Sequence, residues 1–194
     1  MTTGDQQPGF CLFDTAIGRC GVAWGQAGVI GAALPGAGDD QLRWRFAERF
    51  PGVSEQPPPA ALKPVIAGIV ALLAGDKVDL SGAPLDMTAV PPFHRRVYAV
   101  ARTIPAGETM TYGEIALAMG EPREAARAVG EAMGRNPFPI LMPCHRVLGA
   151  GGKPGGFSAP GGVETKLKML RIEGAKVGDT PTLFGDLPLA VKPR

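Results

Sequence analysis

Short apolar segments separated by turn residues dominate the start of the chain. Three of them cover Gly9–Ile17, Gly21–Trp24 and Val29–Leu34, and Gly18 with Arg19 separates the first two. Short apolar segments interrupted by glycine are typical of neighbouring strands in a meander. The pattern therefore predicts a small β-sheet at the N-terminal end.

The spacing of apolar residues then changes to a helical period. Gln41–Phe50 carries an apolar residue at every fourth position, which predicts an amphipathic helix. The nearly apolar Val65–Leu73 predicts a buried helix that ends at Gly75. We expect Asp79–Met87 to form a last strand before a proline linker at Val90–Pro92.

The second half of the chain has a helical pattern. Phe93–Thr103 places apolar residues on one face, which predicts a helix. Thr111 and Glu114 have the spacing of a capping box, in which each side chain accepts from a backbone N–H of the other residue, so a short helix should begin there and end at Gly120. We expect the next helix over residues 121–134. Two helices joined by a turn that contains glycine form a helix-turn-helix.

Charge divides the chain into two parts. The chain has 194 residues, of which 45% are apolar and 20% charged, as in an ordinary folded protein. Residues 1–88 hold a net charge of −3 and residues 89–175 a net charge of +4. We therefore predict two modules with these bounds, followed by a tail at 176–194. A basic module favours a polyanionic partner.

Several protein classes are excluded by what the sequence lacks. The longest nearly apolar run, Val65–Leu73, is much shorter than the roughly 20 residues of a membrane span. The N-terminal residues have neither the basic start nor the apolar stretch of a secretory signal. Cys11, Cys20 and Cys144 are too few and too scattered for a disulfide framework, so we expect a reducing, cytoplasmic setting.

Candidate chemistry is concentrated at Cys144. It follows an apolar run and Pro143, and His145 comes next, although the chain has only two histidines. A thiol attacks as the thiolate, and an imidazole that takes its proton is a common activator. We expect the charge of Arg146 to favour the thiolate. The alternative is that Cys144 is a small buried apolar residue, the usual state of a free cysteine.

The residues around Cys144 resemble those of the O6-alkylguanine-DNA alkyltransferases, also called methylated-DNA–protein-cysteine methyltransferases. Residues 143–147, Pro-Cys-His-Arg-Val, resemble the active-site signature of that family. Residues 111–116 resemble its tyrosine helix, and residues 125–130 its recognition helix. Asn136-Pro137 and residues 156–158 continue the likeness, which covers about residues 93–174 strongly and the first module weakly.

The resemblance implies an α+β protein with an RNase H-like N-terminal module and a helical DNA-binding module. It implies DNA repair by direct reversal of damage. The protein would flip O6-alkylguanine out of double-stranded DNA, which costs a few kcal/mol, and transfer the alkyl group irreversibly to Cys144. It further implies a monomer that works without a cofactor and contacts the minor groove.

The resemblance also implies roles for individual residues. Arg127 would fill the gap that the flipped base leaves, and Gly130 would allow the recognition helix to approach DNA closely. Tyr112 would give a hydrogen bond or proton to the departing guanine. Ser158 would contact the guanine oxygen, and Val147 belongs to the same substrate-binding set.

The remaining roles concern activation of the thiol. Cys144 would give its proton to His145, directly or through water, and Glu173 would polarise that histidine. Asn136 would tie the recognition helix to a strand that carries the cysteine. Some relatives bind zinc in the first module, but two cysteines there cannot supply the usual four ligands, so we expect no metal site.

The chain departs from the family pattern at two places, both in loops or at a helix start, and we expect the second to alter the rim of the pocket. The chain is one residue longer near Arg123-Glu124, and Ala159-Pro160 delays a pair of glycines after Ser158. Two other functions compete with alkyl transfer. A lesion sensor that flips damaged bases without chemistry would lack the cysteine, and a thiol hydrolase would need an oxyanion hole besides the Cys-His pair.

Overall fold

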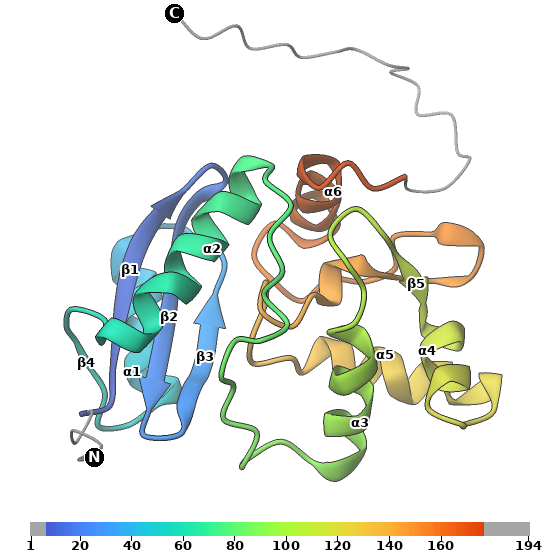
Figure 1. The fold of residues 1–194 in the computed structure, drawn as a ribbon, viewed down its shortest axis with the longest axis horizontal. Coiled ribbons are helices and arrows are strands. Elements are labelled where there is room, and N and C mark those ends of the chain that lie inside the picture. The colour runs from blue at the N-terminus through green and yellow to red at the C-terminus, as the bar shows by residue number, and fades with distance from the viewer. Residues whose placement is uncertain (1–6, 177–194) are drawn as a thin grey trace, which may run out of the picture.

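The first part of the chain forms a four-stranded sheet (Figure 1). The computed structural model describes residues 7–176. In it β1 (Gly9–Thr15) pairs antiparallel with β2 (Gly18–Gly25), and β2 pairs antiparallel with β3 (Gly28–Ala33). The short β4 (Ser54–Glu55) joins the other edge of β1 in parallel. The three strands predicted from the apolar segments are confirmed.

Two helices cover the two faces of this sheet. Successive side chains of a strand point to opposite faces, and β2 follows this rule. Ala23 packs with Phe46 of α1 (Asp39–Arg49), whereas Val22 and Trp24 belong to the core that includes Leu72 of α2 (Lys63–Ala74). In Figure 1, α2 crosses in front of the sheet and α1 lies behind it.

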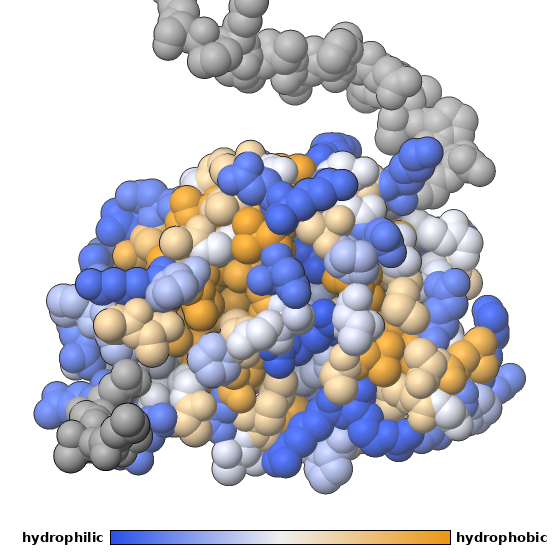
Figure 2. All heavy atoms as spheres, in the orientation of Figure 1, coloured by the Kyte–Doolittle hydropathy of each residue, from blue (hydrophilic) through white to orange (hydrophobic). Residues whose placement is uncertain are grey.

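Helix α2 extends from Lys63 to Ala74 and ends as the sequence predicts. Gly75 adopts the left-handed conformation, with φ of 109°, and its N–H bonds to the carbonyls of the last turn. Ile69 and Leu73 are buried. Apolar side chains also gather on the outer surface over this helix (Figure 2). Both helices expected in the first module are therefore confirmed.

The expected strand over Asp79–Met87 is wrong. This segment forms turns, and only one isolated bridge joins Leu85 to Val29 of β3. Two local features oppose a strand. The Asp79 carboxylate accepts from the N–H of Ser81 at 2.8 Å, which closes a turn, and Pro84 has no N–H to give to a ladder.

The second part of the chain is mainly helical. Its helices are α3 (Pro92–Ala101), α4 (Tyr112–Ala118), α5 (Ala126–Gly134) and α6 (Gly162–Ile172). Two short strands, β5 (Met110–Thr111) and β6 (Val147–Leu148), pair in parallel. Single 3-10 turns occur at Ala60–Leu62, Arg123–Ala125, Cys144–Arg146 and Ala150–Gly152. The mixed α+β class is confirmed.

The predicted capping box begins α4. The N–H of Glu114 donates to the Thr111 hydroxyl at 3.2 Å, and the N–H of Thr111 donates to the Glu114 carboxylate at 2.6 Å. The helix expected over 121–134 is present as α5, preceded by the 3-10 turn at Arg123–Ala125. Tyr112 is the first residue of α4, so the capping box also fixes the backbone position from which the Tyr112 side chain extends.

The sheet and the helical part share one continuous apolar core. The Ala32 N–H at the edge of β3 donates to the carbonyl of Pro137 at 2.9 Å. Within the helical part, the Tyr98 hydroxyl of α3 donates to the carbonyl of Ala132 in α5 at 2.8 Å. The sheet therefore holds the segment that leads to Cys144. The tail predicted at 176–194 falls almost entirely outside the described residues, and none of the described helices is long and apolar enough to cross a membrane.

Candidate active site

Cys144 begins a single 3-10 turn rather than lying on a strand, so the expectation of a cysteine strand is wrong. Strand β6 begins three residues later at Val147, which pairs with Met110 of β5. Because β5 leads directly into α4, this ladder brings Tyr112 and Cys144 to one place. Both residues line a cavity of about 490 Å³.

The segment before Cys144 is held in a strained conformation. Ile140 has a φ of 76°, which is unusual for a β-branched residue, and its side chain is buried. The Asn136 side chain stabilises the segment from within. Its amide nitrogen donates to the Met142 carbonyl at 3.0 Å and to the Cys144 sulfur at 3.2 Å, and its oxygen accepts from the Phe138 N–H at 2.8 Å. These bonds fix the position of the sulfur.

Glu173 is the centre of a buried polar group behind the cysteine. One carboxylate oxygen lies 2.8 Å from His145 Nε2, and Arg146 donates to both oxygens at 2.9 and 2.8 Å. Burial opposes ionisation, but the bonds from His145 and Arg146 outweigh it and lower the pKa of Glu173 to about 2. The carboxylate is therefore ionised at neutral pH.

This carboxylate decides which nitrogen of His145 carries the proton. An ionised carboxylate only accepts hydrogen bonds, so Nε2 must be the protonated nitrogen and Nδ1 carries the lone pair. Nδ1 is buried and has no hydrogen-bond partner among residues 7–176. Burial lowers the pKa of His145, with Glu173 acting in the opposite direction. His145 is thus a neutral imidazole whose Nδ1 can take up a proton.

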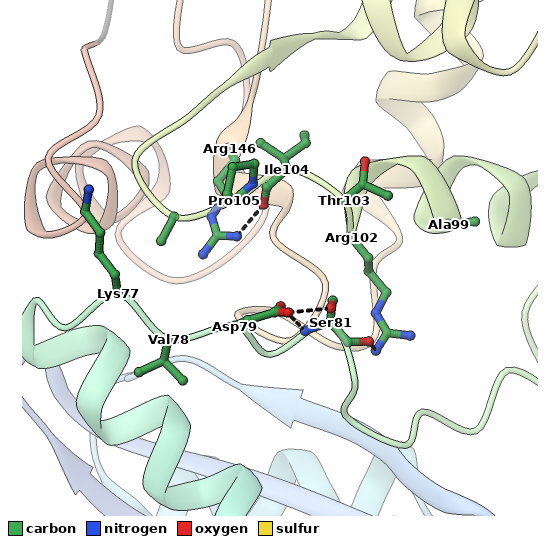
Figure 3. A pocket seen from close by; sticks show the side chains of 11 residues that line it. Lys77, Val78, Asp79, Ser81, Ala99, Arg102, Thr103, Ile104, Pro105 and Arg146 are labelled. Carbon is green, nitrogen blue, oxygen red and sulfur yellow. Dashed lines mark hydrogen bonds between the residues drawn. The ribbon is translucent and has the colours of Figure 1, made fainter.

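Arg146 does not have the position expected of it. Its guanidinium is bonded to Glu173. It also donates to the Ile104 carbonyl at 2.6 Å, a bond that Figure 3 shows. Its charge is thereby compensated by the carboxylate instead of acting on the thiol. A cavity of about 640 Å³ lies beside it, between the turn at Asp79–Ser81 and Arg102, but Cys144 does not line that cavity.

Lys166 supplies the positive charge that the sequence reasoning assigned to Arg146. It is fully buried on α6, and its ammonium donates to the Val147 carbonyl at 2.5 Å. The same ammonium lies 5.9 Å from the centre of the Tyr112 ring. Burial lowers the pKa of Lys166 to about 8, and Cys144 acts against this shift. The sequence reasoning missed this residue.

A signal for Lys166 was nonetheless available in the sequence. Lys166, Met169, Leu170 and Glu173 follow the i, i+3, i+4, i+7 spacing of one helix face, and all four are buried. Two charged residues on the apolar face of a helix are costly unless each has a partner. Their presence at these positions marks a functional or ion-paired site.

Two opposing effects set the pKa of the Cys144 thiol. Burial raises it, while the Asn136 bond, the charge of Lys166 and nearby backbone N–H groups lower it. Burial and the proximity of Cys144 also raise the pKa of the Tyr112 hydroxyl, which therefore stays protonated at neutral pH. The site thus holds a buried thiol, a proton acceptor in Nδ1 of His145 and a proton donor in the Tyr112 hydroxyl.

The other predicted site residues lie around this cavity. Ser158 lines it and donates to the Gly134 carbonyl at 3.0 Å, and Gly130 lines it beside Tyr112. A Cβ on Gly130 would lie 3.9 Å from the Tyr112 ring. Val147 is buried in β6 and takes part through its carbonyl. Arg127 is exposed near the start of α5, outside the lining of the cavity.

Comparison with known proteins places this arrangement in a family. Residues 92–175 match the model of the 6-O-methylguanine DNA methyltransferase DNA-binding domain. The M. tuberculosis OGT solved in complex with DNA is 32% identical, over 88% of this chain and 95% of that one, with a TM-score of 0.68. The chain belongs to the O6-methylguanine-DNA methyltransferase family. The O6-methylguanine-DNA methyltransferase of Pyrococcus kodakaraensis is 30% identical over 86% of this chain and 99% of its own, with a TM-score of 0.65.

Curated members of the family match about half of this chain. The methylated-DNA–protein-cysteine methyltransferase of Mycolicibacterium paratuberculosis is 50% identical over 47% of this chain and 54% of its own length. That of Shigella flexneri is 51% identical over 43% of this chain and 47% of its own. The matched region thus spans about half of the curated relatives.

Neither of the two departures from the family pattern lines the cavity at Tyr112 and Cys144. Arg123 and Glu124 form the 3-10 turn before α5. Ala159 and Pro160 follow Ser158 in the segment that leads to α6, where the Pro160 carbonyl accepts from the Thr165 hydroxyl at 2.8 Å. Ala159 and Pro160 line a smaller cavity that also includes Cys144 and Ser158, so the second departure adjoins the site.

The two cysteines of the first module lie in its sheet. Cys11 and Cys20 are buried, and burial raises the pKa of each thiol to about 11. No group of three or more His, Cys, Asp or Glu side chains suited to a metal ion occurs within residues 7–176.

Proposed function

We propose that this chain repairs DNA by transferring an alkyl group from O6 of guanine to the sulfur of Cys144. The observation that carries the proposal is the buried set of Cys144, His145 and Glu173 beside a cavity that Tyr112 also lines. Membership of the O6-methylguanine-DNA methyltransferase family supports the same chemistry. Because a thioether has no ready route back to a thiol, each molecule would act once.

The proton of the thiol leaves before or during the attack. His145 Nδ1 would be its acceptor, because this nitrogen is buried and has no hydrogen-bond partner among the described residues. Glu173 and Arg146 are positioning residues: the carboxylate stabilises the imidazolium, and the guanidinium holds the carboxylate. Lys166 stabilises the thiolate by its charge.

The guanine must leave as a neutral base. The Tyr112 hydroxyl is still protonated when the C–O6 bond breaks, so it can donate to the purine as negative charge develops there. Ser158 contacts the guanine oxygen from the rim, and Val147 and Gly130 complete the pocket around the base. Together these contacts would stabilise the transition state more than the bound substrate.

Recognition of duplex DNA would use the helix-turn-helix of α4 and α5. The recognition helix α5 lies in the minor groove, with Arg127 inserted in place of the flipped base. Small residues such as Ala128 and Gly130 permit the close approach. Residues 1–88 form an RNase H-like module that supports residues 89–175, and the protein acts as a monomer in the reducing cytoplasm, without a cofactor.

Transfer can be tested with a duplex oligonucleotide that contains one O6-methylguanine. We expect the peptide that bears Cys144 to gain one methyl group in a stoichiometric reaction. Cys144→Ala should abolish the gain, while Cys11→Ala, which changes a thiol outside the cavity, should keep it. Tight binding to the damaged duplex with an unmodified Cys144 would instead indicate a lesion sensor and would overturn the proposal.

A further inference from the structure

A second cavity of about 280 Å³ adjoins the base cavity at Cys144. Both cavities are lined by Met133, Gly134, Cys144, Phe157 and Ser158. The second one, called here the arginine lobe, is completed from the N-terminal sheet side by Leu34, Arg45 and Arg49. The base cavity instead includes Tyr112 and Gly130. The two lobes therefore extend from the sulfur toward different modules.

The arginine lobe contains uncompensated positive charge. Arg45 and Arg49 lie one turn apart on α1, and neither makes an ion pair or side-chain hydrogen bond within residues 7–176, although Arg49 lies 5.4 Å from the centre of the Phe50 ring. Arg43 on the same helix differs, because it meets Asp40 at 3.1 Å and Glu55 at 2.7 Å. Arg135, which also lines the lobe, is paired with Glu131 at 2.7 Å. Desolvation and the charge of Arg45 lower the pKa of Arg49, so the two guanidinium groups repel each other. An anion between them would remove this repulsion.

The position of the lobe suggests which anion it receives. With the purine in the base cavity, the reacting carbon must meet the Cys144 sulfur, and any longer alkyl group must continue past that carbon. The arginine lobe is the second space that Cys144 lines, and Tyr112 does not line it. Pro139 and Pro160 also line the lobe, and its volume of about 280 Å³ suits a short chain.

We propose that the arginine lobe holds the far end of the alkyl group and that Arg45 and Arg49 favour groups that end in a carboxylate. This inference rests on the proposed function. For O6-carboxymethylguanine, the thiolate of Cys144 would form a C–S bond to the methylene carbon as the C–O6 bond breaks. The electron pair stays on the purine, which takes up a proton, so the products are S-carboxymethylcysteine and guanine.

The test compares three duplexes that differ only in the O6 substituent: methyl, carboxymethyl and carbamoylmethyl, the neutral isostere of carboxymethyl. Rates of modification of Cys144 are measured by mass spectrometry for the full chain and for Arg45→Gln/Arg49→Gln. We expect the ratio of the carboxymethyl rate to the methyl rate to fall about tenfold in the double variant, as for loss of hydrogen bonds to a charged group. The carbamoylmethyl ratio should change less. Arg43→Gln is the matched control and should keep all ratios.

An unchanged carboxymethyl ratio in the double variant overturns the proposal. This includes the case in which all three rates fall together, which would instead show that the arginines contact DNA phosphates or support the fold. Thermal unfolding of both variants separates those two explanations. If the unaltered chain transfers no methyl group, the proposed function itself fails, which is a different result from a failure of the arginine lobe.

Discussion

The side-chain amide of Asn136 donates to the sulfur of Cys144 at 3.2 Å, although eight residues separate them. The same amide nitrogen donates to the Met142 carbonyl, and its oxygen holds the Phe138 N–H. One side chain therefore both fixes the cysteine segment and lowers the pKa of the thiol. Removal of the Asn136 side chain should therefore lower the stability of the protein and raise the pKa of the thiol, and the two effects can be measured separately.

Asn136→Ala should lower the free energy of unfolding by about 1–3 kcal/mol, because the Met142 carbonyl and the Phe138 N–H lose their partner. Urea unfolding measures this loss. Both Asn136→Ala and Asn136→Asp should raise the pKa of the thiol, because both remove the donor to the sulfur, and Asn136→Asp should raise it more because it places a negative charge beside the sulfur. The pH profile of Cys144 alkylation by iodoacetamide measures that change, and profiles identical to that of the unaltered chain would contradict it.

Glu173 should make the stability of the protein depend on acid pH. Its pKa is lowered from 4.5 to about 2, so its contribution is complete above 4.5 and is lost as the pH falls toward 2. This shift corresponds to a contribution of about 3 kcal/mol to the free energy of unfolding. Glu173→Gln should flatten the dependence of unfolding free energy on pH over this range. Glu164→Gln, an exposed change on the same helix, should not, and a similar slope in both variants would refute the assignment.

Lys166 should make the stability of the protein depend on alkaline pH, and its charge should speed the reaction of Cys144. Its pKa is lowered from 10.5 to about 8, so the unfolded chain binds more protons between these values and stability rises with pH there. Lys166→Met should remove this rise and also slow the reaction of Cys144 near neutral pH, since the thiolate loses a nearby charge. Chemical unfolding at pH 8 and pH 10 measures the change in stability, and the rate of reaction with iodoacetamide measures the reactivity of Cys144. The control is Lys168→Met, an exposed change two residues away, which should alter neither.

Arg127 should matter only for a base that must leave a duplex. Arg127→Ala should slow transfer from duplex O6-methylguanine by at least about tenfold, the scale of a contact worth 1.4 kcal/mol or more. Transfer from the free base should fall much less, because no stacking gap has to be filled. Arg171→Ala, which removes an exposed arginine of α6, should leave both rates unchanged. Equal losses on the two substrates would show that Arg127 does not fill the gap.

Much of the local structure follows from neighbouring residues alone. The capping box of Thr111 and Glu114, the stop at Gly75 and the apolar period of α1 depend on contacts within one or two turns, so the sequence predicts them. The segment Asp79–Met87 was misread because its apolar residues suit a strand, whereas the turn at Asp79 and the missing N–H of Pro84 oppose one.

The family resemblance, and with it the list of candidate site residues, could also be read from the sequence, because the motifs around Cys144 are contiguous. What only the tertiary structure decided is which side chains meet. Arg146 adjoins the cysteine in sequence but faces Glu173, while Lys166 is twenty-two residues away and acts on the thiol. Arg45 and Arg49 come from α1, which packs on the N-terminal sheet, and line the arginine lobe together with Cys144. Charges act through space across a buried region, and the distances that set their strength are fixed by the packing of α1, α6 and the β5–β6 ladder rather than by position along the chain.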